Sequence, residues 1–439
     1  MLRDIRLAVA AVLVAATIAV VAFVRSAPAH PLGPSPSEPE SAPAAVSATP
    51  GRPSVALSVK SYGSDPMPNA PSAPTADVGQ AKVWELDGRW WAALVEPSSG
   101  AFHIYGLDDD RRHWVDTGVV VDARPGVHPD AIISGDRLYV VSSARSRIAS
   151  AKPEVRRYSY TRDRGWTLDQ GFPVAAYDVG VSSPSIGRDT AGRVWVSFVD
   201  QGHVYVNASG ADETDWGAAW RLPGEGTVVR DEDVARLVAY GGNRIGVFWS
   251  NQVDATFRFA SHPDGAKAAD PDTWTTETAA SGVGIADNHV DVMTAPIGGA
   301  ERVLAVVKTS RNVGAQADRN APLILVLAQR PEGGWTQSIV GRVRDHQTRP
   351  MLLIDPTNRL AVVTTTRDDV GTHIAWQAAS LDDLRFSPGG DRPLIGDEDD
   401  VIIDATSTHS TVDFRKGVVV LGWDQEHGRY EHAVLTLGA

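Results

Sequence analysis

The chain has 439 residues, of which 43% are apolar and 22% charged, the composition of a globular protein with a substantial core. Its formal net charge of −13 repels phosphate groups, which argues against nucleic acid and anionic lipid surfaces as partners. There is no cysteine, so disulfides, thiolate catalysis and thiolate zinc sites are excluded.

The N-terminus predicts export from the cytoplasm. Arg3 and Arg6 precede an almost entirely apolar stretch of 18 residues, 7–24. Such a stretch just spans a bilayer, while residues 27–29 have the small-x-small pattern of a signal-peptide cleavage site. We therefore expect residues 1–29 to be a signal peptide or a membrane anchor, and the protein to be secreted or anchored at the outer face of the cytoplasmic membrane. Contact with a membrane is expected only through this segment.

The next segment differs abruptly in composition. Residues 26–75 hold 12 of the 28 prolines, among many serines and alanines. A segment of this kind buries too little apolar surface to fold, so we expect residues 30–52 to be an extended, disordered stalk. The folded domain is expected at residues 53–439.

After residue 75, short β-branched runs recur at regular intervals without a competing helical periodicity. The strongest run of each unit follows a turn residue and, usually, a basic residue. These turns are centred on Arg89, Arg137, Arg193, Arg244, Arg302, Arg359 and Gly417, and the steps between them are 48, 56, 51, 58, 57 and 58 residues. A period near 50 residues indicates propeller blades or a repeat array.

Each unit has the pattern of four strands. A polar-then-apolar strand leads into the turn, as in residues 131–136, and a run that is apolar on both faces follows, as in 194–199. An alternating strand, such as 155–160, and a strand bearing a tryptophan, such as Trp166 or Trp335, complete the unit. Four antiparallel strands repeated radially form a propeller blade, so the sequence predicts an all-β fold, a β-propeller of seven four-stranded blades.

The seventh unit contains three of its four strands, the third at residues 430–437. A third strand without a neighbour would leave an exposed edge, and propellers tend to protect their edges. Residues 54–59 alternate like a short strand, so we predict that residues 54–60 return to complete the last blade. The alternative is a three-stranded last blade, with residues 54–60 belonging to the stalk.

The units resemble the repeats of a known superfamily. The run Gly192-Arg193-Val194-Trp195-Val196, followed by a late tryptophan, resembles the degenerate repeats of sialidase-like, BNR-repeat-type β-propellers. The resemblance covers about residues 80–439 and is one of rhythm, since residues 163–167 are one residue short of the Asp-box pattern. It implies the propeller fold and, if the protein is an enzyme, a glycoside hydrolase or a polysaccharide lyase.

In a propeller, the starts of the innermost strands converge at one face, and the loops between second and third strands reach the same face. Pockets favour such openings. The ligand-binding candidates at this face are His128, Asp130, Asp233, His289, Asp291, His346, Arg349 and His409 at the strand starts, and Arg145, Arg311, Arg319 and Arg367 in the loops.

These residue types suit three kinds of chemistry. Imidazoles and carboxylates could hold a divalent metal ion, a His or Asp beside an Arg could act as a base next to a stabilised anion, and two carboxylates could cleave a glycoside. None of the spacings is diagnostic, so no catalytic residue is assigned and no cofactor is indicated beyond the option of a metal ion. Polar residues at strand starts also often only satisfy backbone groups.

Two functions are consistent with the sequence. The first is recognition, and cleavage if the site is catalytic, of an extracellular glycan in the funnel at this face. The loop arginines favour an acidic sugar, because a guanidinium pairs with a carboxylate in bidentate fashion. The alternative is a non-catalytic propeller tethered at the cell surface that presents a rim or face to another protein.

Overall fold

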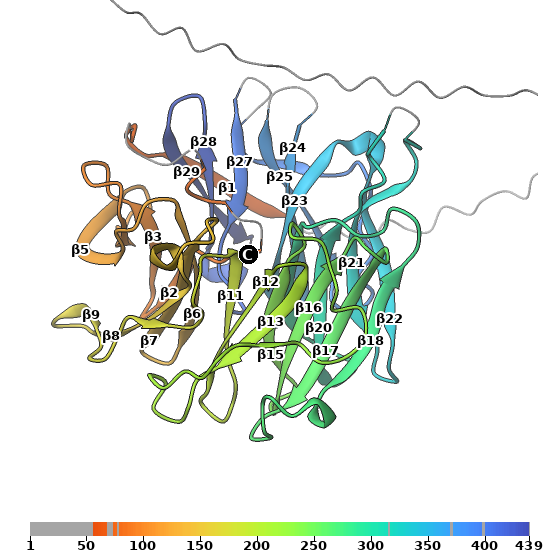
Figure 1. Cartoon of the computed structure of the whole chain (residues 1–439). Helices are drawn as coiled ribbons and strands as arrows, with labels where there is room; N and C mark the ends of the chain where they lie inside the picture. Colours follow the sequence, from red (N-terminus) through yellow and green to blue (C-terminus); the bar gives the residue numbers. More distant parts are fainter. Residues whose placement is uncertain are drawn as a thin grey trace, which may run out of the picture. The chain divides into compact units, whose positions relative to one another are not determined.

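The computed structural model describes residues 56–67, 73–76, 79–314, 317–368, 372–396 and 400–438. The predicted signal or anchor segment (1–29) and the predicted stalk (30–52) lie outside these residues. The described chain forms seven sheets around a centre (Figure 1), with four short 3₁₀ segments: η1 (Ala149–Ala151), η2 (Pro271–Thr273), η3 (Val343–Asp345) and η4 (Phe414–Lys416). None of its helical segments has the length and hydropathy needed to cross a membrane.

The strands follow the repeat along the chain, and the predicted all-β propeller of seven blades is confirmed. Blades 1 to 3 contain β2 (Val83–Leu86), β3 (Arg89–Val95), β4 (Phe102–Leu107) and β5 (Trp114–Asp122); β6 (Val127–Ser134), β7 (Arg137–Ala144), β8 (Glu154–Thr161), β9 (Gly165–Leu168) and β10 (Val174–Ala175); and β11 (Ser182–Arg188), β12 (Val194–Asp200), β13 (His203–Ala208) and β14 (Trp220–Arg221). In blade 2 the fourth position is shared by β9 and β10, which pair with different parts of β8.

The remaining blades have the same order. Blades 4 and 5 contain β15 (Ala235–Tyr240), β16 (Arg244–Asn251), β17 (Thr256–Pro263) and β18 (Thr275–Ser281), then β19 (Val290–Ile297), β20 (Ala300–Lys308), β21 (Pro322–Gln329) and β22 (Trp335–Arg342). Blade 6 contains β23 (Gln347–Asp355), β24 (Leu360–Arg367), β25 (His373–Ser380) and β26 (Arg392–Ile395), and blade 7 contains β27 (Ile402–Thr406), β28 (Val418–Asp424), β29 (Arg429–Leu437) and β1 (Leu57–Gly63).

The last blade is completed by the first strand, as predicted. β1 pairs antiparallel with β29, with Leu57 opposite Leu437 and Gly63 opposite Glu431. In Figure 1 the red-orange β1 accordingly lies beside the blue strands of blade 7. The observed strand begins three residues later than the predicted segment 54–60, and the alternative of a three-stranded last blade is wrong.

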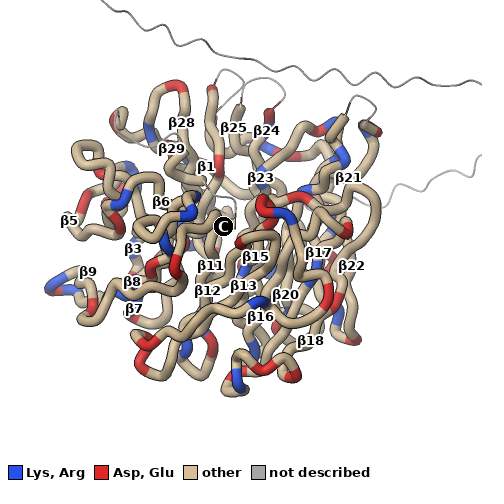
Figure 2. The backbone as a smooth tube through the Cα atoms, viewed as in Figure 1, with Lys and Arg blue, Asp and Glu red and all other residues tan. Residues whose placement is uncertain are grey.

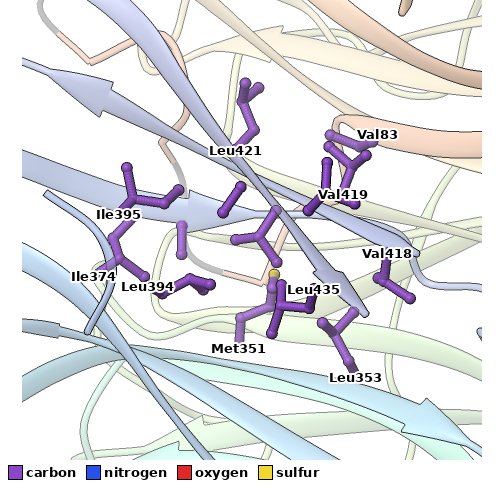
Figure 3. Close-up of a cluster of buried hydrophobic side chains, with 14 of the residues drawn as sticks. Val83, Met351, Leu353, Ile374, Leu394, Ile395, Val418, Val419, Leu421 and Leu435 are labelled. Carbon is purple, nitrogen blue, oxygen red and sulfur yellow. The ribbon is translucent and has the colours of Figure 1, made fainter. Parts of the chain in front are cut away.

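The core consists of apolar layers between neighbouring blades. Every residue of the second strand β12 is buried, because a sheet in the ring has another sheet against each of its faces. Figure 3 shows one such layer, a cluster to which blade 1 contributes Val83, blade 6 contributes Leu353 and blade 7 contributes Val419, which lies beside Val83. The layers therefore join blades that are far apart in sequence, including the first and the last.

The repeated tryptophans belong to these layers, as their spacing suggested. Trp166 on the outer strand β9 is buried and makes edge contacts with Trp84 and Trp91 of blade 1, with ring centroids 6.0 and 5.7 Å apart. Edge-to-face pairs at this distance add to the stability gained by burial. The outer-strand tryptophans thus hold adjacent blades together.

The first strand of each blade lines the central channel of the propeller. Residues 79–82, which precede β2, cross this channel. Ala81 N donates to Asp130 of blade 2 at 2.8 Å, and Lys82 N donates to Thr406 of blade 7 at 3.1 Å. Gly79 has φ +76°, and a Cβ at this position would lie 2.0 Å from the carbonyl oxygen of Val290 in blade 5. Only glycine therefore allows the chain to pass this close to the opposite side of the ring.

Candidate functional site

A cavity of about 770 Å³ opens at the face where the first strands begin. Its volume is typical of a small-ligand site, and its lining comes from blades 2 to 7 and from the segment before β2. The polar and charged lining residues are Arg145, Ser182, Ser183, Asp231, Glu232, Asp233, Arg236, Asn288, His289, Arg349, Asp404 and Gln425.

Three blades deliver side chains to this cavity through the same backbone irregularity. Ser183 in β11, Arg349 in β23 and Asp404 in β27 have φ values of 46°, 49° and 54°, in the left-handed region that residues other than glycine rarely adopt. In each strand the pairing register shifts at this point, as in a β-bulge. Bulges re-aim side chains, and strained residues concentrate at functional sites, so this repeated feature marks the cavity as a candidate site.

Arg349 and Asp404 form an ion pair across blades 6 and 7. Arg349 Nε lies 2.5 Å from Asp404 Oδ1, and the side chain of Arg349 is 36% exposed. In the same lining the buried Arg236 donates from Nη1 to the carbonyl oxygen of Ser183 at 2.9 Å. The carboxylate of Asp404 thus positions one accessible guanidinium, whereas Arg236 ties blade 4 to blade 3.

His289 is held by a buried carboxylate. Its Nδ1 bonds to Oδ1 of Asp287, whose Oδ2 accepts from Lys308 Nζ at 2.7 Å. Burial alone would raise the pKa of Asp287, but the hydrogen bond from His289 and the positive charges of His289 and Lys308 hold it below its usual value. A carboxylate on Nδ1 fixes the tautomer with Nε2 as the basic nitrogen, and nothing in the described part of the chain bonds to Nε2.

Asp233 lines the cavity, but its oxygens are already bonded within blade 4. They accept from the hydroxyl of Ser250 at 2.7 Å, from the backbone of Arg230 at 2.9 Å and from both nitrogens of Gln252 at 3.1 Å. Burial raises the pKa of Asp233 despite these hydrogen bonds. Its geometry is that of a residue that stabilises the loop before β15.

Asp130, Asp291 and His409 lie deeper, in the channel between the first strands. Asp130 accepts from Ile186 N of blade 3 at 3.0 Å, and Asp291 accepts from Leu352 N of blade 6 at 2.8 Å. His409 reaches across the ring, with Nε2 3.2 Å from Asp291 and Nδ1 3.7 Å from Asp130. These three residues are not part of the lining at the mouth, and ligand binding by them stays a prediction. The two carboxylates accept from backbone N–H groups of adjacent blades, and the imidazole of His409 lies between them.

His409 lies away from the lining at the mouth because blade 7 has a long connection. His409 was expected just before an innermost strand, whereas it follows β27 in a connection, residues 407–417, that is longer than the turns of the other blades. It lines a second cavity of about 180 Å³ instead, which shares no residue with the cavity at the mouth.

The remaining candidates divide between the mouth and its surroundings. Arg145 lines the cavity and is exposed. His128 donates from Nδ1 to the carbonyl oxygen of Ala76, 2.8 Å away, in a segment that also lines the cavity. Like His128 itself, four further candidates are not part of the lining: His346, Arg311, Arg319 and Arg367.

Two of these four have evident structural roles. His346 is exposed and ends η3 in a left-handed conformation, with φ 49°. Arg367 pairs with Asp391 at 3.0 Å. The two loops predicted to wall the cleft thus contribute one arginine, Arg145, to the lining.

Four side chains of the candidate site were not predicted from the sequence: Asp404, Asp287, Lys308 and Arg236. The acidic segment 397–400 directly before the apolar run 401–406 could have located β27, and with it Asp404, at the mouth. Asp287 precedes His289 by two residues and could have been paired with it. Lys308 and Arg236 carry no local signal, because they belong to the strands themselves, Arg236 as the second residue of β15 and Lys308 as the last residue of β20.

Charge at this face is mixed. The lining holds three guanidinium groups and four carboxyl groups, and Figure 2 shows basic and acidic positions interspersed along the loops. No group of three or more His, Asp or Glu residues within the described chain is arranged to hold a metal ion. The site therefore offers many hydrogen-bond donors and acceptors, as sugar hydroxyl groups require.

No family model matches the chain, and no curated protein is similar to it in sequence. Among solved structures, an ulvan lyase of polysaccharide lyase family PL25, bound to -[GlcA(1-4)Rha3S]-, has 10% identity and a TM-score of 0.53 over 85% of this chain and 94% of its own. The polysaccharide lyase Uly1 has 9% identity and a TM-score of 0.50 over 83% and 91%. A protein of unknown function from Dyadobacter fermentans has 12% identity and a TM-score of 0.44 over 72% and 100%.

At these identities the likeness shows the fold alone. The chain shares its propeller architecture with enzymes that act on polysaccharides. Neither of these two is a sialidase by its description, so membership of the sialidase-like superfamily stays a prediction.

Proposed function

We propose that the protein binds an extracellular glycan carrying carboxylate groups in the cavity at the mouth, and that it cleaves this glycan by elimination. The proposal is supported by the polar cavity, by the basic imidazole within it and by a fold that is shared with polysaccharide lyases. The extracellular location rests on the apolar N-terminal stretch after two arginines.

Arginine side chains would receive the carboxylate. Arg145 and Arg349 both line the cavity, from blades 2 and 6, and both are accessible from solvent. A guanidinium binds a carboxylate through two parallel hydrogen bonds, which fixes the orientation of the sugar ring. It also withdraws charge from the carboxylate, and this makes the proton on the adjacent carbon more acidic.

His289 would then act as the base. Its Nε2 takes the proton from the carbon next to the carboxylate, the C–O bond at the following carbon breaks, and the electron pair of the C–H bond forms a C=C bond. The imidazolium returns the proton to the oxygen of the leaving sugar, so atoms and charge balance. Asp287 stabilises the imidazolium while it exists.

The observation that carries this proposal is the convergence of Arg349 and Asp404, on strained bulges of different blades, with the His289–Asp287 pair in one cavity. The test is to incubate the protein with polyuronides, sulfated polyuronides and neutral glucans, and to follow the unsaturated product by its ultraviolet absorbance. Turnover is expected with the carboxylated polymers alone.

Variants separate catalysis from folding. His289→Ala should lower turnover by about 10²- to 10⁴-fold, the usual contribution of a general base. His346→Ala is the matched control, because this histidine lies at the same face outside the cavity lining. The absence of both binding and turnover on every carboxylated glycan would remove the proposal.

A second candidate is a protein partner at the same face. Four valines on successive loops, from the connection between blades 3 and 4 to blade 5, are exposed: Val228 (56%), Val253 (59%), Val283 (95%) and Val313 (75%). Hydrogen bonds connect these loops, for example Asn251 Nδ2 to Val228 O at 2.9 Å. Exposed apolar ridges of this kind mark interaction surfaces.

This candidate has its own test. A photo-crosslinking residue in place of Val283 should capture a protein in living cells, whereas the same residue in place of Val115, on the outer strand of blade 1, should not. Equal capture at both positions, or none, would count against a partner at this surface.

A further inference from the structure

A third cavity, of about 450 Å³ and with a polar lining, lies between blades 4 and 5. Its lining comes from the end of β15, the starts of β16, β18 and β20, and the ends of β17 and β21, which run from yellow-green to turquoise in Figure 1. First strands begin at the mouth, so their ends and the starts of second strands are at the opposite face. The two cavities share no residue.

Arg302 in this cavity differs from its counterparts in the repeat. The basic residue before the second strand is bonded in four other blades: Arg89 to Leu107 O at 2.9 Å, Arg193 to Asp189 at 2.9 Å, Arg244 to Ser261 at 3.2 Å and Arg359 to Asp382 at 2.9 Å. Arg302 has no hydrogen bond or ion pair with any described residue, and its Nε is buried without a partner. Within the described fold, no other group therefore holds the guanidinium of Arg302 in place beside the cavity.

Gln329 supplies a complementary group. Its Nε2 donates to Glu277 Oε1 at 3.2 Å, which fixes the orientation of the amide, and its Oε1 is buried without a partner. A buried polar group without a hydrogen bond costs about 1–3 kcal/mol. A ligand that offers an acceptor to Arg302 and a donor to Gln329 would remove both costs.

The rest of the lining describes the ligand. Tyr240 and Phe259 provide ring surface, and Ser261, Thr275 and Thr276 provide hydroxyl groups. Two guanidinium groups, from Arg244 and Arg302, face one carboxylate, from Glu277, so the cavity favours a negatively charged ligand.

We infer that this cavity is a second ligand site, which takes a single sugar residue bearing a carboxylate. Arg302 binds the carboxylate, while Gln329 and Glu277 bind ring hydroxyls and the face of the ring lies against Tyr240. The site is separate from the cavity at the mouth and does not depend on the function proposed for it.

The test is calorimetric titration of the full chain with sodium glucuronate, glucose, acetate and sulfate. One arm of the experiment uses the double variant Arg349→Ala/His289→Ala, in which the cavity at the mouth is altered. Glucuronate should still bind to this variant, and the remaining binding is then assigned to the site at Arg302. Arg302→Gln should weaken its binding by about tenfold or more, as the loss of a charged hydrogen bond does.

Arg137→Gln is the matched control, since Arg137 occupies the same repeat position in blade 2, is exposed and lies outside the cavity. The side chain of Arg302 has no partner in the described fold, so its replacement should not lower the melting temperature. If Arg302→Gln does not fold, Arg302→Lys, which keeps the charge but loses the planar fork, gives the second measurement.

Three results overturn the inference: no glucuronate binding by the wild-type protein, loss of all binding in the arm with the altered mouth, or unchanged binding after replacement of Arg302. Glucose and acetate should each bind about tenfold more weakly than glucuronate, because each offers half of the required groups. Sulfate binding as tight as that of glucuronate would show an anion site and refute recognition of a sugar.

Discussion

Replacement of Asp130 tests whether the carboxylates of the central channel hold the blades together. Its two oxygens accept from Ala81 N at 2.8 Å and Ile186 N at 3.0 Å, and both donors are buried, so Asp130 joins blades 1, 2 and 3. Asp130→Ala leaves two buried N–H groups unpaired, at a cost of about 1–3 kcal/mol each. We therefore expect the free energy of unfolding to fall by about 2–6 kcal/mol.

A graded series gives the comparison. Ser185→Ala removes one bond of the same kind, from Leu237 N at 3.1 Å, and should cost about half as much. Asp130→Asn keeps one acceptor oxygen and loses the other, so its loss of unfolding free energy should lie between those of Ser185→Ala and Asp130→Ala. The assay is urea unfolding followed by tryptophan fluorescence. Equal losses for Asp130→Ala and Ser185→Ala would refute the view that Asp130 bridges two blades.

Three further predictions concern the centre and the closure of the ring. Gly79→Ala should destabilise the fold by about 1–3 kcal/mol more than Gly88→Ala, because both residues have a positive φ but an added Cβ meets the Val290 carbonyl only at position 79; equal melting temperatures would contradict this. Burial alone would lower the pKa of His409, but the hydrogen bond with Asp291 and the charges of Asp130 and Asp291 raise it. The stabilisation by His409 is thus complete below its unfolded-state pKa of about 6.5 and is lost as the pH rises through the higher folded-state value, so His409→Gln should flatten the fall in unfolding free energy above about pH 6.5. A chain that starts at Asp65 lacks β1 and should melt earlier and self-associate, as measured by light scattering, compared with one that starts at Ser54.

The architecture was predictable because its signals are local and repeated. Each turn followed by an apolar run marks the first two strands of a blade, and seven repetitions leave little choice of fold. The closing strand could be predicted for a physical reason as well, since β29 without β1 would be an unprotected edge.

The site was predictable only in outline. Topology brings His289 and Arg349 to one opening, but no sequence pattern says whether a carboxylate at a strand start faces solvent or a neighbouring backbone N–H, and Asp130 and Asp291 do the latter. The left-handed positions of the two bulges are occupied by Arg349 and Asp404 and not by glycine, which is the usual sequence signal for this conformation. The sequence therefore does not predict these bulges.

The crossing of the channel by residues 79–82, together with the span of His409 between Asp130 and Asp291, limits how a polymer can be handled. No linear chain can be threaded along the propeller axis, because buried side chains occupy the middle of that path. A long glycan bound at the mouth as proposed would have to lie flat over the opening, with one unit reaching inward, and both fragments would leave on the side from which it arrived. Repeated cleavage of one polymer would then require the polymer to slide across the loops.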